Sequence, residues 1–479
     1  MDRTLDYAII VAYLIGIAIF GIITGGKQKT VKDYFLGTKS VPWWAVCFSI
    51  VAAETSTLTF ISIPGLAYLA NLNFLQVTIG YLLGRIVIAI FFLPAYYSGE
   101  LSTAYAFLEN RFGHKTRSFA SIVFLFTRTA ADGVRLFATA IPLKLLIDID
   151  YFTAVVIIAV IALAYTTIGG VRGVIWVDVI QMFIYLGGAI IAAIFLIYNF
   201  VPGGLDTILS NAALENKLDI FNWGFSGGIS GFFDQPYTVL GGILGGAFLS
   251  MASHGTDQLI VQRLLTIDNL KDSRKAIVGS GIIVIIQFAI FLFVGICLYA
   301  FYGGAAMKSD EIFPKFIIEN LPVGISGIIV AGLFAAALST LAGSISSLSS
   351  STMLDLYKPF SKSSDPKKEL KISRLFTVMW AFLLVCSALF FMNSSQTVVE
   401  LALSIASFTY GGLLGTFMLG LFVKEATQED ALAGFTAGIF IMITVIFMKL
   451  AAWTWFTLIG VAATMLVGTL LSKLSRNNN

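Results

Sequence analysis

One stretch decides the fold: Ser49-Ile-Val-Ala-Ala-Glu-Thr-Ser-Thr-Leu-Thr-Phe-Ile-Ser-Ile-Pro64, which interrupts an apolar segment long enough to cross a bilayer. Its carboxylate, Glu54, lies at mid-membrane depth, where a charge costs at least ~2.5–3.5 kcal/mol and must face water, a cation or a basic partner. The hydroxyl side chains at positions 55–57 and 59 can bond the backbone in place of regular helix hydrogen bonds. The stretch predicts a broken helix whose free carbonyls line a cavity or bind an ion. The alternative is a kinked structural helix with Glu54 paired internally.

The composition is that of a polytopic membrane protein. Of 479 residues, 58% are hydrophobic and only 12% are charged, about half of the charged fraction of soluble domains. The net charge of +3 is too small to indicate a nucleic-acid partner. Three widely separated cysteines and two histidines do not form a metal site or disulfide framework, and no phosphate-binding loop is present. These observations disfavour an enzyme and an ATP-driven pump.

Apolar runs of about 20 residues predict an all-α protein with about thirteen transmembrane helices. The expected spans are 6–25, 42–68, 74–98, 116–146, 151–168, 173–200, 237–265, 275–302, 323–357, 372–393, 396–423, 431–448 and 452–472. The first run has no signal-peptide features and is expected to be retained. Residues 201–235 predict an ordered external loop, and the Ser-rich run 343–352 predicts a tightly packed helix. We therefore expect one integral membrane domain over residues 1–479.

The distribution of basic residues predicts the orientation in the membrane. Of the 30 Lys and Arg residues, 21 fall in loops on one side and six on the other, while Arg85, Arg128 and Arg135 fall within spans. Basic residues concentrate in cytoplasmic loops. The N-terminus is therefore expected outside and the C-terminus in the cytoplasm, in a multi-pass protein of the plasma (inner) membrane.

A second polar interruption, Leu249-Ser-Met-Ala-Ser-His-Gly-Thr-Asp-Gln258, comes five spans after the first. Broken segments at corresponding positions of two halves indicate an inverted-repeat transporter with its binding site near the midplane. The expected repeats cover residues 42–200 and 237–423. The spans 6–25, 431–448 and 452–472 are then flanking helices.

The span 323–357 offers oxygen ligands for a hard cation such as Na⁺. In Ala335-Ala-Ala-Leu-Ser-Thr340, the carbonyl of Ala336 and the hydroxyls of Ser339 and Thr340 lie within one helical turn. Ser and Thr are common in membrane helices, so this pattern gains weight from the free carbonyls expected at 52–55. Asp178, one to two turns into its span, is either a cation-path carboxylate or the partner of a basic residue such as Arg172.

Three charged residues, Arg128, Asp132 and Arg135, share one helix face by their spacing and can pair along it. The two arginines exceed the single aspartate by one charge. Either Glu54 or a carboxylate of the solute could supply the missing anion. In the second case, Arg135 is a solute contact. Arg85 is another candidate partner for Glu54.

Together these residues resemble the sodium/solute symporter family, which includes sodium/glucose, sialic acid, proline, pantothenate, iodide and monocarboxylate cotransporters. The resemblance covers essentially the whole chain, and its most specific piece is Gly169-Gly-Val-Arg-Gly-Val-Ile-Trp-Val-Asp-Val-Ile-Gln181. Supporting pieces lie at 103–112, 261–263, 355–358 and 411–415. The family is similar in fold to the leucine transporter, a five-plus-five inverted repeat, as the two interruptions suggest.

The resemblance also implies site residues. It places sodium on the carbonyls of Ala52, Thr55 and Ala336 and the hydroxyls of Ser339 and Thr340. A second sodium site in some members needs hydroxyls where this chain has Ala342 and Gly343, which implies a single sodium. By position, the solute cavity would draw on Glu54, Ser56, Thr59, Phe74, Thr78, Ser253, His254, Gln258 and Arg135.

The sequence thus predicts a secondary active transporter that couples inward Na⁺ flux to uptake of a small organic solute by alternating access. A sugar, sugar acid, monocarboxylate or amino acid all fit. The expected partners are the solute, Na⁺ and the lipid bilayer, with no organic cofactor, and one chain is expected to function as a monomer. A proton-coupled symporter using Glu54 or Asp178 and a transporter-like nutrient sensor are the alternatives.

Overall fold

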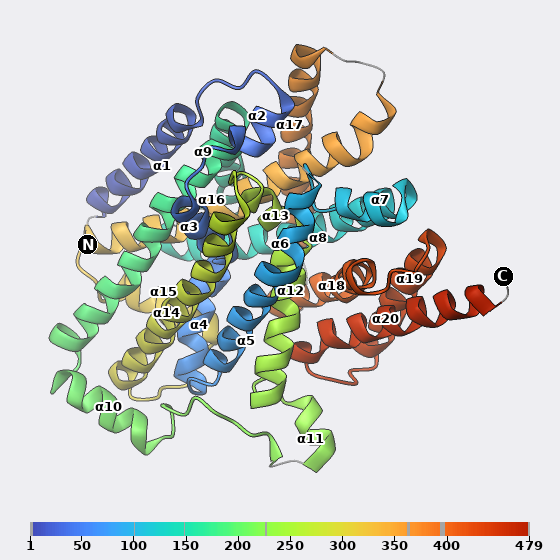
Figure 1. The fold of residues 1–479 in the computed structure, drawn as a ribbon. Helices are drawn as coiled ribbons and strands as arrows, with labels where there is room; N and C mark the ends of the chain where they lie inside the picture. Colours follow the sequence, from blue (N-terminus) through green and yellow to red (C-terminus); the bar gives the residue numbers. More distant parts are fainter. Residues whose placement is uncertain are drawn as a thin grey trace.

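The computed structural model describes residues 3–99, 101–147, 149–225, 228–361, 365–392 and 398–477, and these ranges are almost entirely helical (Figure 1). The helices are α1 (Thr4–Gly25), α2 (Val31–Leu36), α3 (Trp43–Glu54), α4 (Thr57–Leu69), α5 (Phe74–Val87), α6 (Leu93–Ser98), α7 (Ala106–Phe112), α8 (His114–Ile147), α9 (Tyr151–Phe195), α10 (Gly204–Leu214), α11 (Gly228–Asp234), α12 (Gly246–Gly255), α13 (Gln258–Leu264), α14 (Leu270–Tyr302), α15 (Ser309–Glu319), α16 (Ile325–Ser351), α17 (Pro366–Phe391), α18 (Val398–Phe422), α19 (Gln428–Phe447) and α20 (Trp453–Asn477). The all-α prediction is confirmed, and the expected external loop contains α10 and α11.

Within these ranges, eight helices are long and apolar enough to cross a membrane, or nine if the bent pair Val31–Lys39 and Trp43–Glu54 forms one span. The expected count of thirteen is not confirmed. The count of long helices is lower than thirteen for two structural reasons. Broken spans are divided into short helices, and α9 joins two expected spans in one element.

The first expected interruption is a true break between α3 and α4. Thr55 and Ser56 have extended backbone angles (φ −83°, ψ 100° and φ −87°, ψ 168°), so the helix stops and restarts. The Ser56 side chain accepts a hydrogen bond from the Thr59 backbone N–H and caps the new helix. The hydroxyl-rich sequence therefore breaks the helix as predicted.

The second interruption separates α12 from α13. Thr256 and Asp257 leave the helical region, and the Asp257 carboxylate caps α13 by accepting from the Leu259 N–H at 2.9 Å. Both expected interruptions are therefore confirmed as breaks between half-helices. The repeat boundaries 42–200 and 237–423 stay predictions.

The long element α9 is a helical hairpin. Gly170 inside it has φ +59°, a conformation that glycine adopts without strain. A Cβ atom on Gly21 of α1 would lie 2.8 Å from Tyr165 and 2.7 Å from Val177. A straight helix would separate those two residues by ~18 Å. The chain therefore reverses near Gly170, which gives the two expected spans 151–168 and 173–200.

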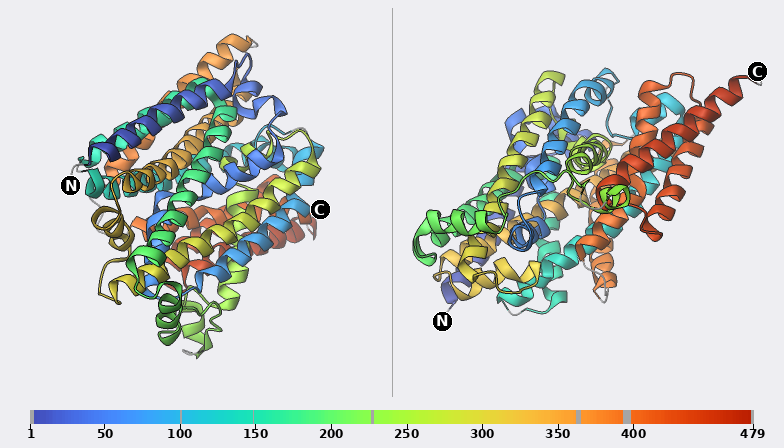
Figure 2. Two further views of the ribbon diagram at one scale, coloured as in Figure 1. Left: turned by 90° about the vertical axis from the view of Figure 1, so that its left-hand side faces the viewer. Right: turned by 90° about the horizontal axis from the view of Figure 1, so that it is seen from below.

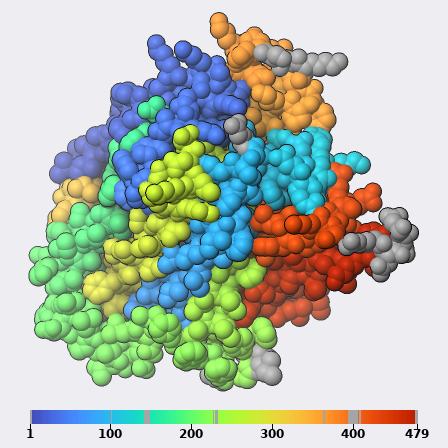
Figure 3. All heavy atoms as spheres, in the orientation of Figure 1, coloured from blue at the N-terminus to red at the C-terminus, as the bar shows by residue number. Residues whose placement is uncertain are grey.

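The helix α16 lies at the centre of the molecule. Nearly every residue from Ser326 to Ser351 is buried, which confirms the prediction that the Ser-rich run packs tightly. It packs against α1, α3, α4, α8, α9 and α17. The C-terminal helices α18–α20 pack on one another, and this group also packs on α8 and α12. The group lies on the right in the right-hand view of Figure 2 and forms a continuous orange-to-red region in Figure 3.

Candidate functional site

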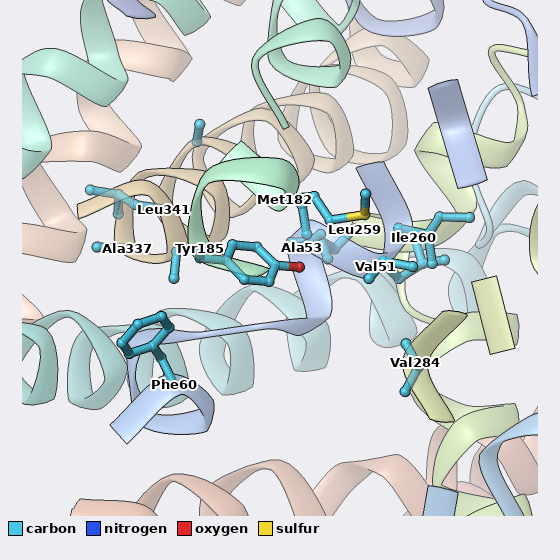
Figure 4. Packing of buried hydrophobic residues seen from close by; sticks show 14 of the residues in the cluster. Val51, Ala53, Phe60, Met182, Tyr185, Leu259, Ile260, Val284, Ala337 and Leu341 are labelled. Carbon is cyan, nitrogen blue, oxygen red and sulfur yellow. The ribbon is translucent and has the colours of Figure 1, made fainter. Parts of the chain in front are cut away.

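The break between α3 and α4 leaves backbone acceptors at the centre of the fold. Among the described residues, no backbone N–H donates to the carbonyls of Ala52 and Thr55, both in fully buried residues. The Thr55 hydroxyl is fixed instead, because it donates to the Val51 carbonyl and lies 2.6 Å from the Gln287 amide nitrogen. Figure 4 shows the ring of Tyr185 pointing toward this break from α9. These carbonyls are available to a ligand.

The residues expected to complete a cation site lie on α16, which packs against both α3 and α4. The Thr340 hydroxyl donates to the Ala336 carbonyl at 3.1 Å, and the Ser339 hydroxyl donates to Asp178 Oδ1 at 2.6 Å. All three α16 residues are buried. Each hydroxyl uses its hydrogen on a protein acceptor, so its lone pairs can face a cation. The donor set is neutral oxygen throughout, which suits Na⁺.

Asp178 forms a buried ion pair, though with a different partner from the one that the sequence suggested. Arg263 Nη2 lies 2.9 Å from Asp178 Oδ2, whereas Arg172 makes no such pair in the described structure. The same carboxylate oxygen accepts from Ser49 at 2.5 Å. Arg263 itself is buried in α13. A role of Asp178 in the cation path stays a prediction.

The guanidinium of Arg263 packs against a glycine on α16. A Cβ atom on Gly343 would lie 2.7 Å from Arg263 Nη2, so a side chain there would displace it. The position at which a second sodium would need a hydroxyl therefore faces a fixed positive charge. This packing is a structural reason for glycine at 343.

Glu54 is neutralised by an internal partner. Arg85, fully buried on α5, donates from Nη2 to Glu54 Oε2, and the same nitrogen lies 2.9 Å from His254 Nε2. His254 Nδ1 in turn lies 2.8 Å from the Ser253 hydroxyl. Of the two anions considered for the surplus positive charge on α8, Glu54 is thus used elsewhere.

Close helix packing brings Glu54, Arg85 and His254 together. A Cβ atom on Gly80 of α5 would lie 2.4 Å from the carbonyl oxygen of Ile243, in the helical turn before α12. A Cβ atom on Gly84 would lie 2.4 Å from that of Ala247 in α12. Small residues let two membrane helices approach this closely. Arg85 follows directly after Gly84 and thereby reaches both half-helix breaks.

The charges on α8 pair as their spacing predicts. Asp132 Oδ2 lies 2.6 Å from Arg128 Nε, and Asp132 Oδ1 accepts from Arg135 Nη1 at 3.0 Å. The missing anion is Asp257 at the second break, which accepts from Arg128 at 3.0 Å and from the Tyr410 hydroxyl at 3.0 Å. Asp257 was not among the expected site residues, because its position before α13 does not indicate a partner on α8.

A cavity joins this charged group to the candidate cation site. It is lined by Ser56, Thr57, Asp132, Arg135, Leu136, Thr139, Ala337, Thr340 and Leu341. Of the three paired charges Arg128, Asp132 and Arg135, Arg135 is the least buried, with a quarter of its side chain exposed. The cavity therefore offers one guanidinium and several hydroxyls beside Thr340, a set that suits an anion carrying hydroxyl groups.

Of the other expected solute residues, some lie at this cavity and others do not line it. Ser56 lines the cavity, and Thr59 lies near it on α4. Phe74 stacks on Phe288, and the Thr78 hydroxyl is buried and donates to the Leu75 carbonyl. The Gln258 amide is used at both ends, because its oxygen accepts from the Ala104 N–H and its nitrogen lies 3.1 Å from the Ser350 hydroxyl. Gln258 therefore has a structural role.

Comparisons with known proteins point to transport. A model of the family described as "Sodium:solute symporter family" matches residues 34–438. The sodium/sialic acid symporter NanT of Aliivibrio fischeri is 31% identical over 99% of this chain and 94% of its own length. The sodium/sialic acid symporter SiaT of Proteus mirabilis is 29% identical, over 98% and 95%.

Solved structures agree with these sequence matches. A substrate-bound, outward-open Na⁺-coupled sialic acid symporter superimposes with a TM-score of 0.88 at 28% identity, covering 98% of both chains. A nucleobase-cation-symport-1 family transporter superimposes with a TM-score of 0.59 at 13% identity, covering 92% of this chain and 94% of its own, and shows a shared fold only.

The pairing of Glu54 with Arg85 can be tested by a double-mutant cycle. Arg85→Gln leaves a buried carboxylate without its partner and is expected to cost about 3–5 kcal/mol of stability. Glu54→Gln together with Arg85→Gln removes both charges and should cost less than Arg85→Gln alone. Thermal unfolding of the purified protein measures both. A double variant as unstable as the sum of the two single variants would contradict the pairing.

Proposed function

Because this chain belongs to the sodium:solute symporter family, we propose that the solute it carries is a sugar acid of the sialic acid type. The chain is a multi-pass, Na⁺-coupled solute symporter of the leucine-transporter fold, and it is not an enzyme. The observation that carries the proposal is the cavity in which Arg135 lies among the hydroxyls of Ser56, Thr57, Thr139 and Thr340. A guanidinium binds a carboxylate, and hydroxyls bind a polyol.

The relatives support this choice of solute. NanT and SiaT, which match 99% and 98% of this chain, are both sialic acid symporters by their names, as is the superimposed structure. In alternating access, Arg135 would hold the carboxylate of the solute, while sodium binds at Ser339 and Thr340 of α16, beside the same cavity. Ser56 would bind hydroxyl groups at the break. The remaining candidates Glu54, Thr59, Ser253 and His254 would line the approach.

Uptake into proteoliposomes tests the solute. An inward NaCl gradient should drive uptake of sialic acid, and KCl should not, whereas the neutral amide of sialic acid should be a poor solute. Arg135→Ala removes a charge-assisted hydrogen bond worth ~1.5–3 kcal/mol, so kcat/KM should fall roughly 10- to 100-fold. Arg274→Ala, whose guanidinium donates to the Ala89 carbonyl, is the control. Uptake of a neutral sugar in preference to the acid would contradict the proposal.

We propose one sodium per cycle, bound by the carbonyls of Ala52, Thr55 and Ala336 and the hydroxyls of Ser339 and Thr340. The free carbonyls at the α3 break and the packing of α16 against it support this set. The guanidinium of Arg263, which lies against Gly343 and pairs with Asp178, supports a single site because it already neutralises the nearest buried carboxylate.

The dependence of uptake on sodium concentration tests this set. A single site predicts a Hill coefficient near one, and a value near two would exclude it. Ser339→Ala or Thr340→Ala removes one oxygen ligand, and a loss of about 1.4 kcal/mol would raise the half-saturating sodium concentration about tenfold. Ser349→Ala, whose hydroxyl donates only to the Ile345 carbonyl of its own helix, should leave it unchanged.

We also propose that the protein lies in the plasma (inner) membrane as a functional monomer, with its N-terminus outside and its C-terminus in the cytoplasm. The asymmetry of basic residues supports the orientation. In a cysteine-free background, Arg3→Cys should react with an impermeant maleimide on intact cells, and Ser475→Cys only after permeabilisation. The reverse pattern would contradict the orientation.

Mixtures of active and Arg135→Ala protein test the monomer. They should transport in proportion to the active fraction.

A further inference from the structure

Four charges, three of them buried, form one compensated cluster beside the proposed solute site. Arg128 and Arg135 carry two positive charges, and Asp132 and Asp257 carry two negative ones, joined by the contacts of 2.6–3.0 Å described above. A net charge is costly where water is excluded, so the cluster is stable because its formal charges cancel. Any ion that binds beside it changes that balance.

Asp132 is shared between the solute site and the central helix. Its Oδ1 accepts from Arg135, whereas its Oδ2 accepts from the Ser344 hydroxyl of α16 and lies beside Arg128. Asp132 is almost fully buried, so these partners replace its hydration. While Oδ1 holds Arg135, a solute carboxylate must compete with Asp132 for the same guanidinium.

Ser344 has two acceptors for one hydrogen. Its hydroxyl lies 2.9 Å from the Thr340 carbonyl as well as within hydrogen-bond distance of Asp132. A hydroxyl donates one hydrogen bond at a time. Ser344 can therefore bond its own helix or the Asp132 carboxylate, and this choice is a local two-state element one turn from the proposed sodium ligand Thr340.

The proposed sodium ligands are all neutral oxygens, so a bound sodium adds one uncompensated positive charge. Asp132 lines the same cavity as Thr340, whereas Asp178 does not line it. The Asp132 carboxylate, which is shared between two arginines, is thus the counter-charge for that ion on the cavity wall. A solute carboxylate brings the second negative charge that Arg135 then requires.

We propose that Asp132 is the positioning residue that couples solute binding to sodium binding. Sodium attracts the Asp132 carboxylate toward α16, where Ser344 holds it, and Arg135 is released to bind the carboxylate of the solute. Sodium adds one positive charge and the solute one negative charge, so only the doubly loaded site is neutral. Each ligand therefore raises the affinity for the other by the same factor. This inference rests on the proposed function.

Equilibrium binding of sialic acid in NaCl and in KCl measures the coupling as a ratio of dissociation constants. Coupling factors of roughly 5–150 are typical, and we expect the wild-type ratio in that range. Asp132→Asn should bind sialic acid more tightly in KCl, since Arg135 loses its competitor, and the ratio should approach one. Ser344→Ala keeps every charge and should lower the ratio with little change in KCl.

Two matched variants control for structural damage. Ser347→Ala removes a buried hydroxyl of the same helix that donates only to the Ser344 carbonyl. Asp355→Asn removes a buried carboxylate that likewise accepts from an arginine on α8, Arg117 Nε at 2.8 Å, and from a serine on α16, Ser351 at 2.8 Å. Both should keep the wild-type ratio. Ratios at the wild-type level in both Asp132→Asn and Ser344→Ala would overturn the inference.

A sodium titration without solute separates this inference from the proposed function. Sodium-dependent thermal stabilisation should need a several-fold higher sodium concentration in Asp132→Asn, because the ion loses its counter-charge. If the wild type binds no sialic acid in either salt, the proposed solute is wrong, and the titration still decides. An unchanged sodium midpoint in Asp132→Asn would overturn the role of Asp132.

Discussion

The absence of water from a bilayer is the constraint on which this structure depends. A backbone carbonyl that no N–H group satisfies is tolerated there only if it lines a cavity or binds an ion. The chain places such carbonyls at Ala52 and Thr55 and surrounds them with protein: α16 packs across the break, and Tyr185 and Gln287 fix the Thr55 hydroxyl. The hairpin α9 and the glycine contacts of α5 with α12 supply the close packing that this enclosure requires.

Compensation of buried charge follows from the same constraint. Glu54 is paired with Arg85, Asp178 with Arg263 and Asp355 with Arg117. Asp257 is paired with Arg128, and Asp132 with both Arg128 and Arg135. Each of these five carboxylates is held by an arginine, which stays protonated in proteins. Because these ion pairs leave little net charge, a cation or an anion that binds alone adds an uncompensated charge. A cation and an anion that bind together leave the net charge unchanged. The sodium coupling of the family agrees with that arrangement.

The two interrupted helices have different tasks in this scheme. The α3–α4 break presents carbonyls, whereas the α12–α13 break presents Asp257, which both caps a half-helix and neutralises Arg128. One residue thus ties the backbone of the second break to the charges of α8. A movement of α12 or α13 would shift Asp257 and thereby Arg128. Because Arg128 and Arg135 share Asp132, it would also change the contacts of Arg135.

Features that depend on neighbours along the chain could be predicted without a structure. Hydrophobic runs predicted the helices, and clusters of hydroxyl side chains predicted the breaks. Helical spacing predicted that Arg128, Asp132 and Arg135 pair, and that oxygen-bearing groups of Ala336, Ser339 and Thr340 lie within one turn of α16. The partners of Asp178 and Arg128 were decided only by the tertiary structure, because Arg263 and Asp257 lie on another half-helix, far along the chain. Spacing predicts which residues share a face of one helix. It does not predict which helices meet, because that is decided by packing among all of them, such as the approach that Gly80, Gly84 and Gly343 permit.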